Sequence, residues 1–118
     1  MSATRVLLAI WLVAALPAVA SADARSDARA QVEFGIAVAQ KGLWKEALYR
    51  WERATQIDPS YAAAYNNLAI AYEQSGDFDR ARKAYERATE LEPNNLQIRQ
   101  NFDLFKEIND RTSRTQER

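Results

Sequence analysis

The chain has 118 residues, and its 16 basic side chains balance 16 acidic ones, with no histidine and no cysteine. These absences exclude thiolate zinc sites and nucleophile systems that depend on Cys or on a Ser–His pair. The even charge argues against a nucleic-acid partner, because proteins that bind nucleic acid usually carry a basic excess or stripe. With 47% hydrophobic residues and little Gly or Pro, the composition predicts a compact, helical protein.

The N-terminal segment, residues 1–22, has the pattern of a secretory signal peptide. Arg5 is the only charged side chain in this segment, and an unbroken apolar stretch spans residues 6–16. Small residues follow at the spacing that signal peptidase requires, so we expect cleavage after Ala22, with cleavage after Ala20 or Ala24 as alternatives. The alternative interpretation is an uncleaved inner-membrane anchor, because the weakly polar run approaches the length of a bilayer span. Either interpretation predicts export, with the periplasm of a Gram-negative bacterium as the expected compartment.

An internal repeat follows this segment. Residues 28–59 align with residues 62–93 at an offset of 34, and 12 of the 32 aligned positions are identical. Each unit has a glycine that suits the end of a first helix and a proline that stops a second helix. The residue after each proline is expected to cap the next helix. The glycines are Gly42 and Gly76, the prolines are Pro59 and Pro93, and the expected caps are Ser60 and Asn94.

Large apolar residues recur at spacings of three and four in the second helix of each unit, which predicts a buried stripe. Trp44 and Trp51 belong to this stripe, and Phe78 and Tyr85 occupy the same positions one unit later. We therefore interpret the two tryptophans as core residues and not as stacking platforms for a ligand.

Together these positions resemble the tetratricopeptide repeat family. The resemblance implies an all-α fold, a short α-solenoid of two helix-turn-helix repeats closed by a C-terminal capping helix. The matching residues are Phe34, Gly35, Gly42, Trp44, Ala47, Trp51, Ala54, Ile57 and Pro59 in the first repeat. In the second repeat they are Tyr65, Leu68, Ala69, Tyr72, Gly76, Phe78, Ala81, Tyr85, Ala88, Leu91 and Pro93. The first repeat departs from the pattern at Gln31 and Val38, which stand opposite Tyr65 and Tyr72.

The chain therefore divides into six segments. Apolar residues after the second repeat, including Phe102 and Phe105, predict a helix that covers the exposed end of the solenoid. The residues beyond it are polar, and we expect them to be disordered. The segments are the signal peptide at 1–22, a linker at 23–27, the repeats at 28–61 and 62–95, the capping helix at 96–109 and the tail at 110–118.

The resemblance also implies a binding surface, because the first helices of successive repeats line a concave groove in this family. The expected groove residues are Glu33, Ile36, Gln40, Asn66, Asn67, Ile70, Glu73, Gln74, Gln97 and Asn101, and Arg29, Val32, Gln100 and Leu104 lie in the same register. One subtype of the family grips a C-terminal carboxylate with Lys, Arg and Asn side chains at five of these positions, and of these only the asparagine at Asn67 is present in this chain. Here those positions hold Val32, Ile36, Asn67, Gln97 and Asn101, so that specificity is not predicted.

The predicted function is therefore a non-catalytic, exported module that binds a peptide or a partner helix in the groove. We expect no catalytic residue, metal site, cofactor, small-molecule substrate or nucleic-acid partner, and membrane association only if the N-terminal segment is uncleaved. The alternative is a self-associating structural subunit or assembly factor of a cell-envelope complex, in which the end faces of the solenoid mediate contact and the chain forms a homo-oligomer.

Overall fold

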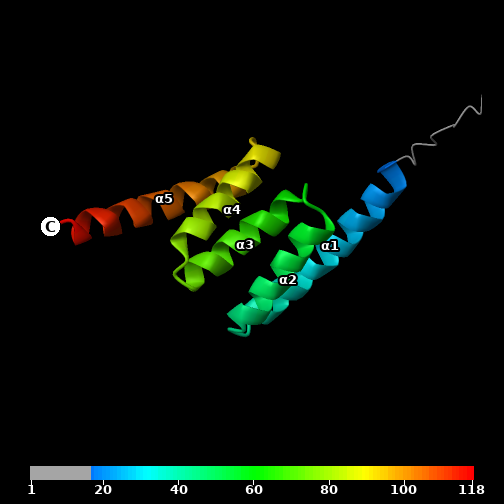
Figure 1. Cartoon of the computed structure of the whole chain (residues 1–118), viewed down its shortest axis with the longest axis horizontal. Helices are drawn as coiled ribbons and strands as arrows, with labels where there is room; N and C mark the ends of the chain where they lie inside the picture. Colours follow the sequence, from blue (N-terminus) through cyan, green and yellow to red (C-terminus); the bar gives the residue numbers. More distant parts are fainter. Residues whose placement is uncertain (1–16) are drawn as a thin grey trace, which may run out of the picture.

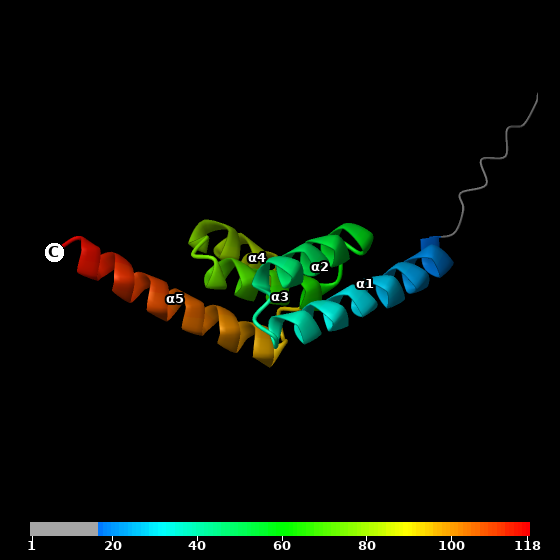
Figure 2. The same cartoon turned by 90° about the horizontal axis from the view of Figure 1, so that it is seen from below.

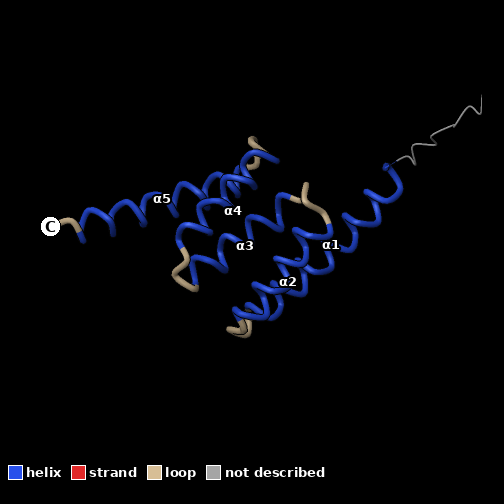
Figure 3. Tube along the Cα trace, viewed as in Figure 1, coloured by secondary structure: helices blue, strands red, loops and turns tan. Residues whose placement is uncertain are grey.

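The computed structural model describes residues 17–118 as five α-helices joined by short loops, and this range contains no strand (Figure 3). The all-α solenoid predicted from the sequence is confirmed. Most of the predicted signal peptide lies outside the described residues. The helices are α1 (Pro17–Ala39), α2 (Trp44–Ile57), α3 (Ala62–Gln74), α4 (Phe78–Leu91) and α5 (Leu96–Gln116).

The helices form two hairpins and a single last helix. Helix α1 pairs with α2, α3 pairs with α4, and α5 packs on α4 (Figure 1). Seen from below, α2 and α4 occupy one side of the molecule, whereas α1 and α5 run along the opposite side and diverge toward its two ends (Figure 2). Because α3 contacts α1, α2 and α4, it is the central element of the fold.

Both hairpins turn through the same backbone motif. Gly42 and Gly76 adopt φ angles of 78° and 76°, in the left-handed region that favours glycine. In each turn the next N–H donates back across the glycine to the preceding helix, from Leu43 to the Val38 carbonyl at 3.0 Å and from Asp77 to the Tyr72 carbonyl at 2.9 Å. This six-to-one bond closes the helix end, so the glycine prediction is confirmed.

The expected helix caps were wrong by one residue. Helix α3 begins after Tyr61, which makes no side-chain cap, and α5 begins after Asn95, whose side chain accepts a hydrogen bond from the Ile98 N–H at 3.2 Å. The loop after each proline is one residue longer than expected. As a result, Ser60 turns back to the end of α2, where its N–H and hydroxyl both donate to Asp58 Oδ1.

The core is organised around one large side chain in each hairpin. Trp51 and Tyr85 are each only 2% exposed, and small alanines on the neighbouring helices allow the rings to sit close to the backbone. The prediction of core residues was less accurate for the other two aromatic residues of the stripe, which are only partly buried. Trp44 is half-buried, and Phe78 is 46% exposed, because both stand in the first turn of their helices at the edge of the hairpin.

Helix α5 occupies the place of the first helix of a third repeat. Phe102 stacks on Tyr85 with ring centroids 5.5 Å apart, and Phe105 lies against the same ring at 5.4 Å. At the position where the first two repeats have Gly35 and Ala69, α5 has Asp103. The two small residues are buried, whereas the Asp103 side chain is 71% exposed and pairs with Lys106 at 3.3 Å. Helix α5 therefore packs as the predicted capping helix, because its aromatic residues contact the core of the second hairpin while Asp103 is exposed.

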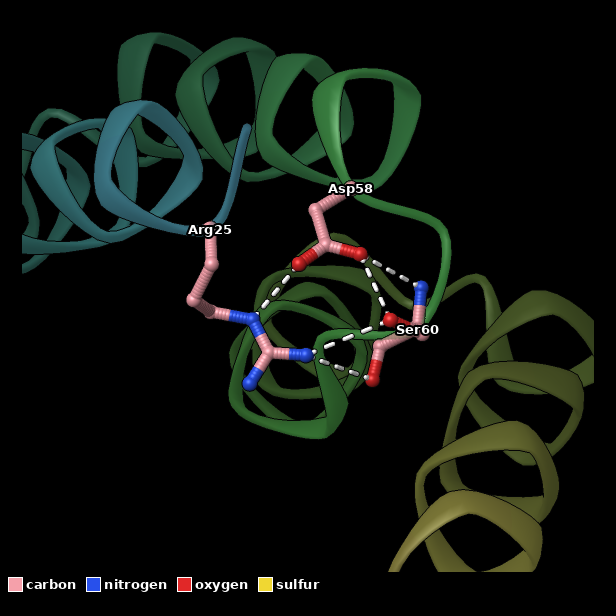
Figure 4. Close-up of polar contacts among 3 residues, drawn as sticks. All are labelled: Arg25, Asp58 and Ser60. Carbon is pink, nitrogen blue, oxygen red and sulfur yellow. Dashed lines mark hydrogen bonds and ion pairs between the residues drawn. The ribbon is translucent and has the colours of Figure 1, made fainter. Parts of the chain in front are cut away.

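The predicted linker at residues 23–27 is instead part of α1. Arg25 fixes this first part of the helix to the α2–α3 loop, because its Nε donates to Asp58 Oδ2 at 2.5 Å and its guanidinium bonds Ser60 (Figure 4). The same guanidinium lies 4.7 Å from the centroid of the Tyr61 ring. Burial raises the pKa of Asp58, but the hydrogen bonds from Ser60 and Arg25 outweigh it and hold the pKa below its ordinary value of 3.8.

The Arg25–Asp58 contact predicts a pH-dependent stability. Because folding lowers the pKa of Asp58, its contribution is present above about pH 4 and is lost as the pH falls through the lowered value. Arg25→Ala should lower the free energy of unfolding at pH 7 by about 1 kcal/mol, a modest value because Arg25 is partly exposed. It should also flatten the acid side of the stability curve measured by urea unfolding. Arg29→Ala, one turn later on α1, is the control, and an equal effect of both changes would contradict this role.

The tail at 110–118 was expected to be disordered, but α5 continues to Gln116. Arg111 pairs with Glu107 one turn earlier, and such i,i+4 pairs support a helix even where apolar contacts are missing. Asn109 and Thr112 also reach the α3–α4 turn, where they line a hollow with Asp77 and Phe78.

Within residues 17–118, none of the helices has the length and apolar content that crossing a membrane requires.

Candidate functional site

A groove runs across the face formed by α1, α3 and α5. Its larger hollow has a volume of about 490 Å³, and six of the predicted groove residues line it. Helix α1 contributes two of them, α3 three and α5 one, so all three helices border a common space. The six residues are Glu33, Ile36, Asn66, Asn67, Ile70 and Gln97.

A second hollow of about 320 Å³ continues the groove toward the α1–α2 turn. Ile36, Asn67 and Ile70 line both hollows, and Gln40 is the seventh predicted residue found in the groove. Trp44 and Trp51 form part of the wall. The two hollows therefore share two isoleucines and one asparagine at the centre of the groove.

Three predicted residues do not line these hollows. Asn101 donates its amide N–H to Asn66 Oδ1 at 3.2 Å and so ties α5 to α3. The Tyr85 hydroxyl donates a short hydrogen bond to Glu73, and this carboxylate links the end of α3 to the core of the second hairpin. Burial and this carboxylate raise the pKa of Tyr85, which keeps the hydroxyl protonated. Gln74 is exposed at the last residue of α3.

Asn67 presents a hydrogen-bond acceptor to the groove. Its amide N–H donates to the Ala63 carbonyl one turn earlier at 2.8 Å, which orients the side chain. No hydrogen bond between described residues uses its Oδ1 atom. This oxygen can therefore accept a hydrogen bond from the backbone N–H of a ligand, whereas Asn66 and Asn101 are engaged with each other.

The groove carries few charges. Arg29 and Glu33, both on α1, are the charged residues among those that line its two hollows, and the others are apolar or neutral polar residues. Within the described part of the chain, no group of three or more His, Cys, Asp or Glu residues is placed to hold a metal ion. The arrangement is suited to binding apolar side chains and a few backbone groups.

The sequence prediction missed four residues of the larger hollow: Tyr61, Ala63, Asn95 and Ile98. Tyr61 and Asn95 are the cap residues of α3 and α5, and they occupy the same position in successive repeats. The same repeat offset relates Ala63 to the predicted Gln97. Including the positions before each first helix would therefore have identified Tyr61 and Asn95, and the repeat offset from Gln97 would have identified Ala63, whereas Ile98 has no counterpart among the predicted groove residues.

Two family matches identify the repeats. Residues 62–95 match the family described as tetratricopeptide repeat, and residues 35–76 match the family described as TPR repeat. Among curated proteins, none matches this chain. Repeats of this type generally mediate protein–protein interactions and are typically non-catalytic. The two matches together cover residues 35–95, from the last residues of α1 through α4 and just over half of the chain, and the chain is a tetratricopeptide repeat protein.

Proposed function

We propose that this protein is an exported, non-catalytic interaction module that binds a peptide or a partner helix in the groove formed by α1, α3 and α5. The observation that carries this proposal is the common space that seven predicted residues line across the three helices. Its floor is apolar at Ile36 and Ile70, and the Asn67 oxygen beside them can accept a hydrogen bond.

The repeat places equivalent residues side by side along the groove. Ile36 and Ile70 are equivalent positions of the two repeats and line both hollows, whereas Leu104, which holds the same register on α5, is 57% exposed and lines neither hollow. First helices of adjacent repeats pack at roughly 10 Å. A helical ligand that crosses them presents one side chain about every 10 Å if its apolar residues recur at every seventh position. The groove therefore favours an uncharged, apolar helix face.

A charge placed on the floor tests this function. Ile36→Glu should reduce partner binding at least tenfold, because it puts a carboxylate where an apolar side chain would be buried. Ile36 is 39% exposed, so the fold should tolerate the change. Recovery of partners from native envelopes, with quantification against wild type, measures the effect, and Lys45→Glu on the exposed side of α2 is the control. Equal recovery by both variants would place binding elsewhere.

Export is a separate part of the proposal. The pattern of residues 1–22 supports it, with a charged N-terminus, an apolar stretch and small residues before Asp23. When the full chain is expressed in a Gram-negative bacterium, we expect the protein in the periplasmic fraction with Asp23 as its first residue, as determined by N-terminal sequencing. An intact N-terminus in the membrane fraction would support the anchor instead.

Self-association is the second candidate, and one surface favours it. Phe34 on α1 and Tyr49 on α2 are 47% and 55% exposed in the first hairpin. In the second hairpin the position of Phe34 is held by Leu68, which is 7% exposed and packs with the core around Trp51. Sedimentation of the protein at high micromolar concentration distinguishes the candidates, because a monomer there would exclude the homo-oligomer.

A further inference from the structure

A further hollow lies outside the groove, on the second hairpin between α3 and α4. Its volume is about 220 Å³, and its lining is mainly apolar. Three residues of α3 form the floor, and four residues of α4 form the rim. They are Tyr65, Leu68 and Tyr72 on the floor and Arg80, Lys83, Ala84 and Arg87 on the rim. None of them lines the groove.

The first hairpin contains the counterpart of this hollow, and one arginine fills it. Arg50 is the counterpart of Ala84 in the first repeat, and it lies 4.2 Å from the centroid of the Phe34 ring, the counterpart of Leu68. Its guanidinium pairs with Glu46 at 3.0 Å and donates to the Gln31 side chain at 3.4 Å. The surroundings of Arg50 in the first hairpin therefore suit a cation, because they offer an aromatic face, a carboxylate and an amide oxygen.

The second hairpin keeps the shape and inverts the charge. Ala84 leaves the space above the floor open, and the position of Glu46 is taken by Arg80. Arg80 pairs with Asp77 at 3.4 Å and Arg87 pairs with Glu90 at 3.3 Å, but these side chains are exposed and such pairs are weak. Between them stands Lys83, for which no ion pair with a described residue is found. The lining of this hollow therefore includes three basic side chains and no acidic one.

We propose that this α3–α4 hollow binds a short acidic segment of a partner protein. One aromatic or aliphatic side chain of the segment lies over Tyr65, Leu68 and Tyr72, and carboxylates beside it pair with Lys83 and the two arginines. The apolar floor excludes an inorganic anion as the main occupant, because most of the lining would remain unused. The hollow is also smaller than the roughly 300–1,000 Å³ of small-molecule sites, which favours a single inserted side chain.

A defined peptide tests the proposal on the full chain. The probe is a synthetic peptide with one phenylalanine flanked on each side by three acidic residues, and binding is followed by amide chemical shifts of the isotope-labelled protein. We expect the shifts to concentrate on α3 and α4 around Tyr65, Tyr72 and Lys83. A peptide with alanine in place of phenylalanine, and one with amides in place of the acids, should each bind at least tenfold more weakly.

Two variants localise the binding. Ala84→Arg should weaken it at least tenfold by filling the hollow as Arg50 does in the first hairpin, and Lys83→Glu should do the same by reversing the rim charge. Lys45→Glu, another exposed lysine change, should leave binding unchanged. If Ala84→Arg does not fold, Lys83→Glu decides alone, because Lys83 is exposed. Shifts centred on the groove, no shifts at millimolar peptide, or equal loss in Lys83→Glu and Lys45→Glu would overturn the proposal.

Discussion

Replacing Trp51 with alanine should lower the free energy of unfolding by about 3–5 kcal/mol, which is the usual cost of deleting a large buried aromatic side chain. Trp51 is 2% exposed and belongs to the core cluster that joins α1, α2 and α3. Its indole N–H also donates to the Val32 carbonyl at 3.1 Å. The change therefore leaves a cavity and removes a hydrogen bond between the helices of the first hairpin.

Such a loss is a large fraction of the total stability of a small domain, so the variant should be partly or wholly unfolded at room temperature. Urea unfolding followed by circular dichroism measures the effect. Tyr49→Ala is the matched control, because Tyr49 is an aromatic residue on the same helix and is 55% exposed. Cooperative unfolding of Trp51→Ala at the wild-type midpoint would contradict the central position of this ring.

Gly35→Ala should destabilise the protein by about 1–3 kcal/mol, the usual cost of overpacking a core. This sign is opposite to that expected from helix propensity, which favours alanine over glycine by about 1 kcal/mol in a helix. A Cβ atom at Gly35 would lie 2.4 Å from Nε1 of Trp51 and 2.8 Å from its Cδ1. The ring cannot yield easily, because its N–H is bonded to the Val32 carbonyl and its other face is packed.

A double-mutant cycle separates the steric cause from other effects. In a Trp51→Phe background the ring is smaller and lacks the indole nitrogen, so Gly35→Ala should cost less than in wild type. The free energies of unfolding of the four proteins, obtained from urea titrations, give the coupling. A stabilising Gly35→Ala, or the same cost in both backgrounds, would show that the close approach of Gly35 and Trp51 does not limit stability.

The repeat offset predicted most of the fold, because each structural role recurs at the equivalent position of the next repeat. Gly42 and Gly76 close their helices in the same way, and Trp51 and Tyr85 fill equivalent places in the core. The structure differed from the sequence prediction at residues whose role depends on contacts that the repeat spacing does not reveal. Arg25 is helical in the structure and bonded to a loop that is distant in the sequence, which no local pattern around residue 25 reveals.

The helical tail was missed for a related reason. Residues 110–116 lack apolar side chains, and composition alone favoured disorder, but ion pairs between successive turns need no apolar face. The groove was predicted more completely, since seven of the ten expected residues line its hollows. The repeat register predicted that Asn101 lies in the groove. It could not predict that the Asn101 amide N–H donates a hydrogen bond to Asn66 instead of facing a ligand.

The residue at the glycine position of each first helix also governs whether the solenoid can be lengthened. In each repeat, a large ring of the second helix packs close to a small residue of the first helix, which is Gly35 in the first repeat and Ala69 in the second. At the equivalent position α5 has Asp103, which presents a charged side chain. Appending a copy of α2 or α4 after α5 would therefore bury a carboxylate. A designed three-repeat version of this protein needs Asp103→Gly or Asp103→Ala before the added helix can dock.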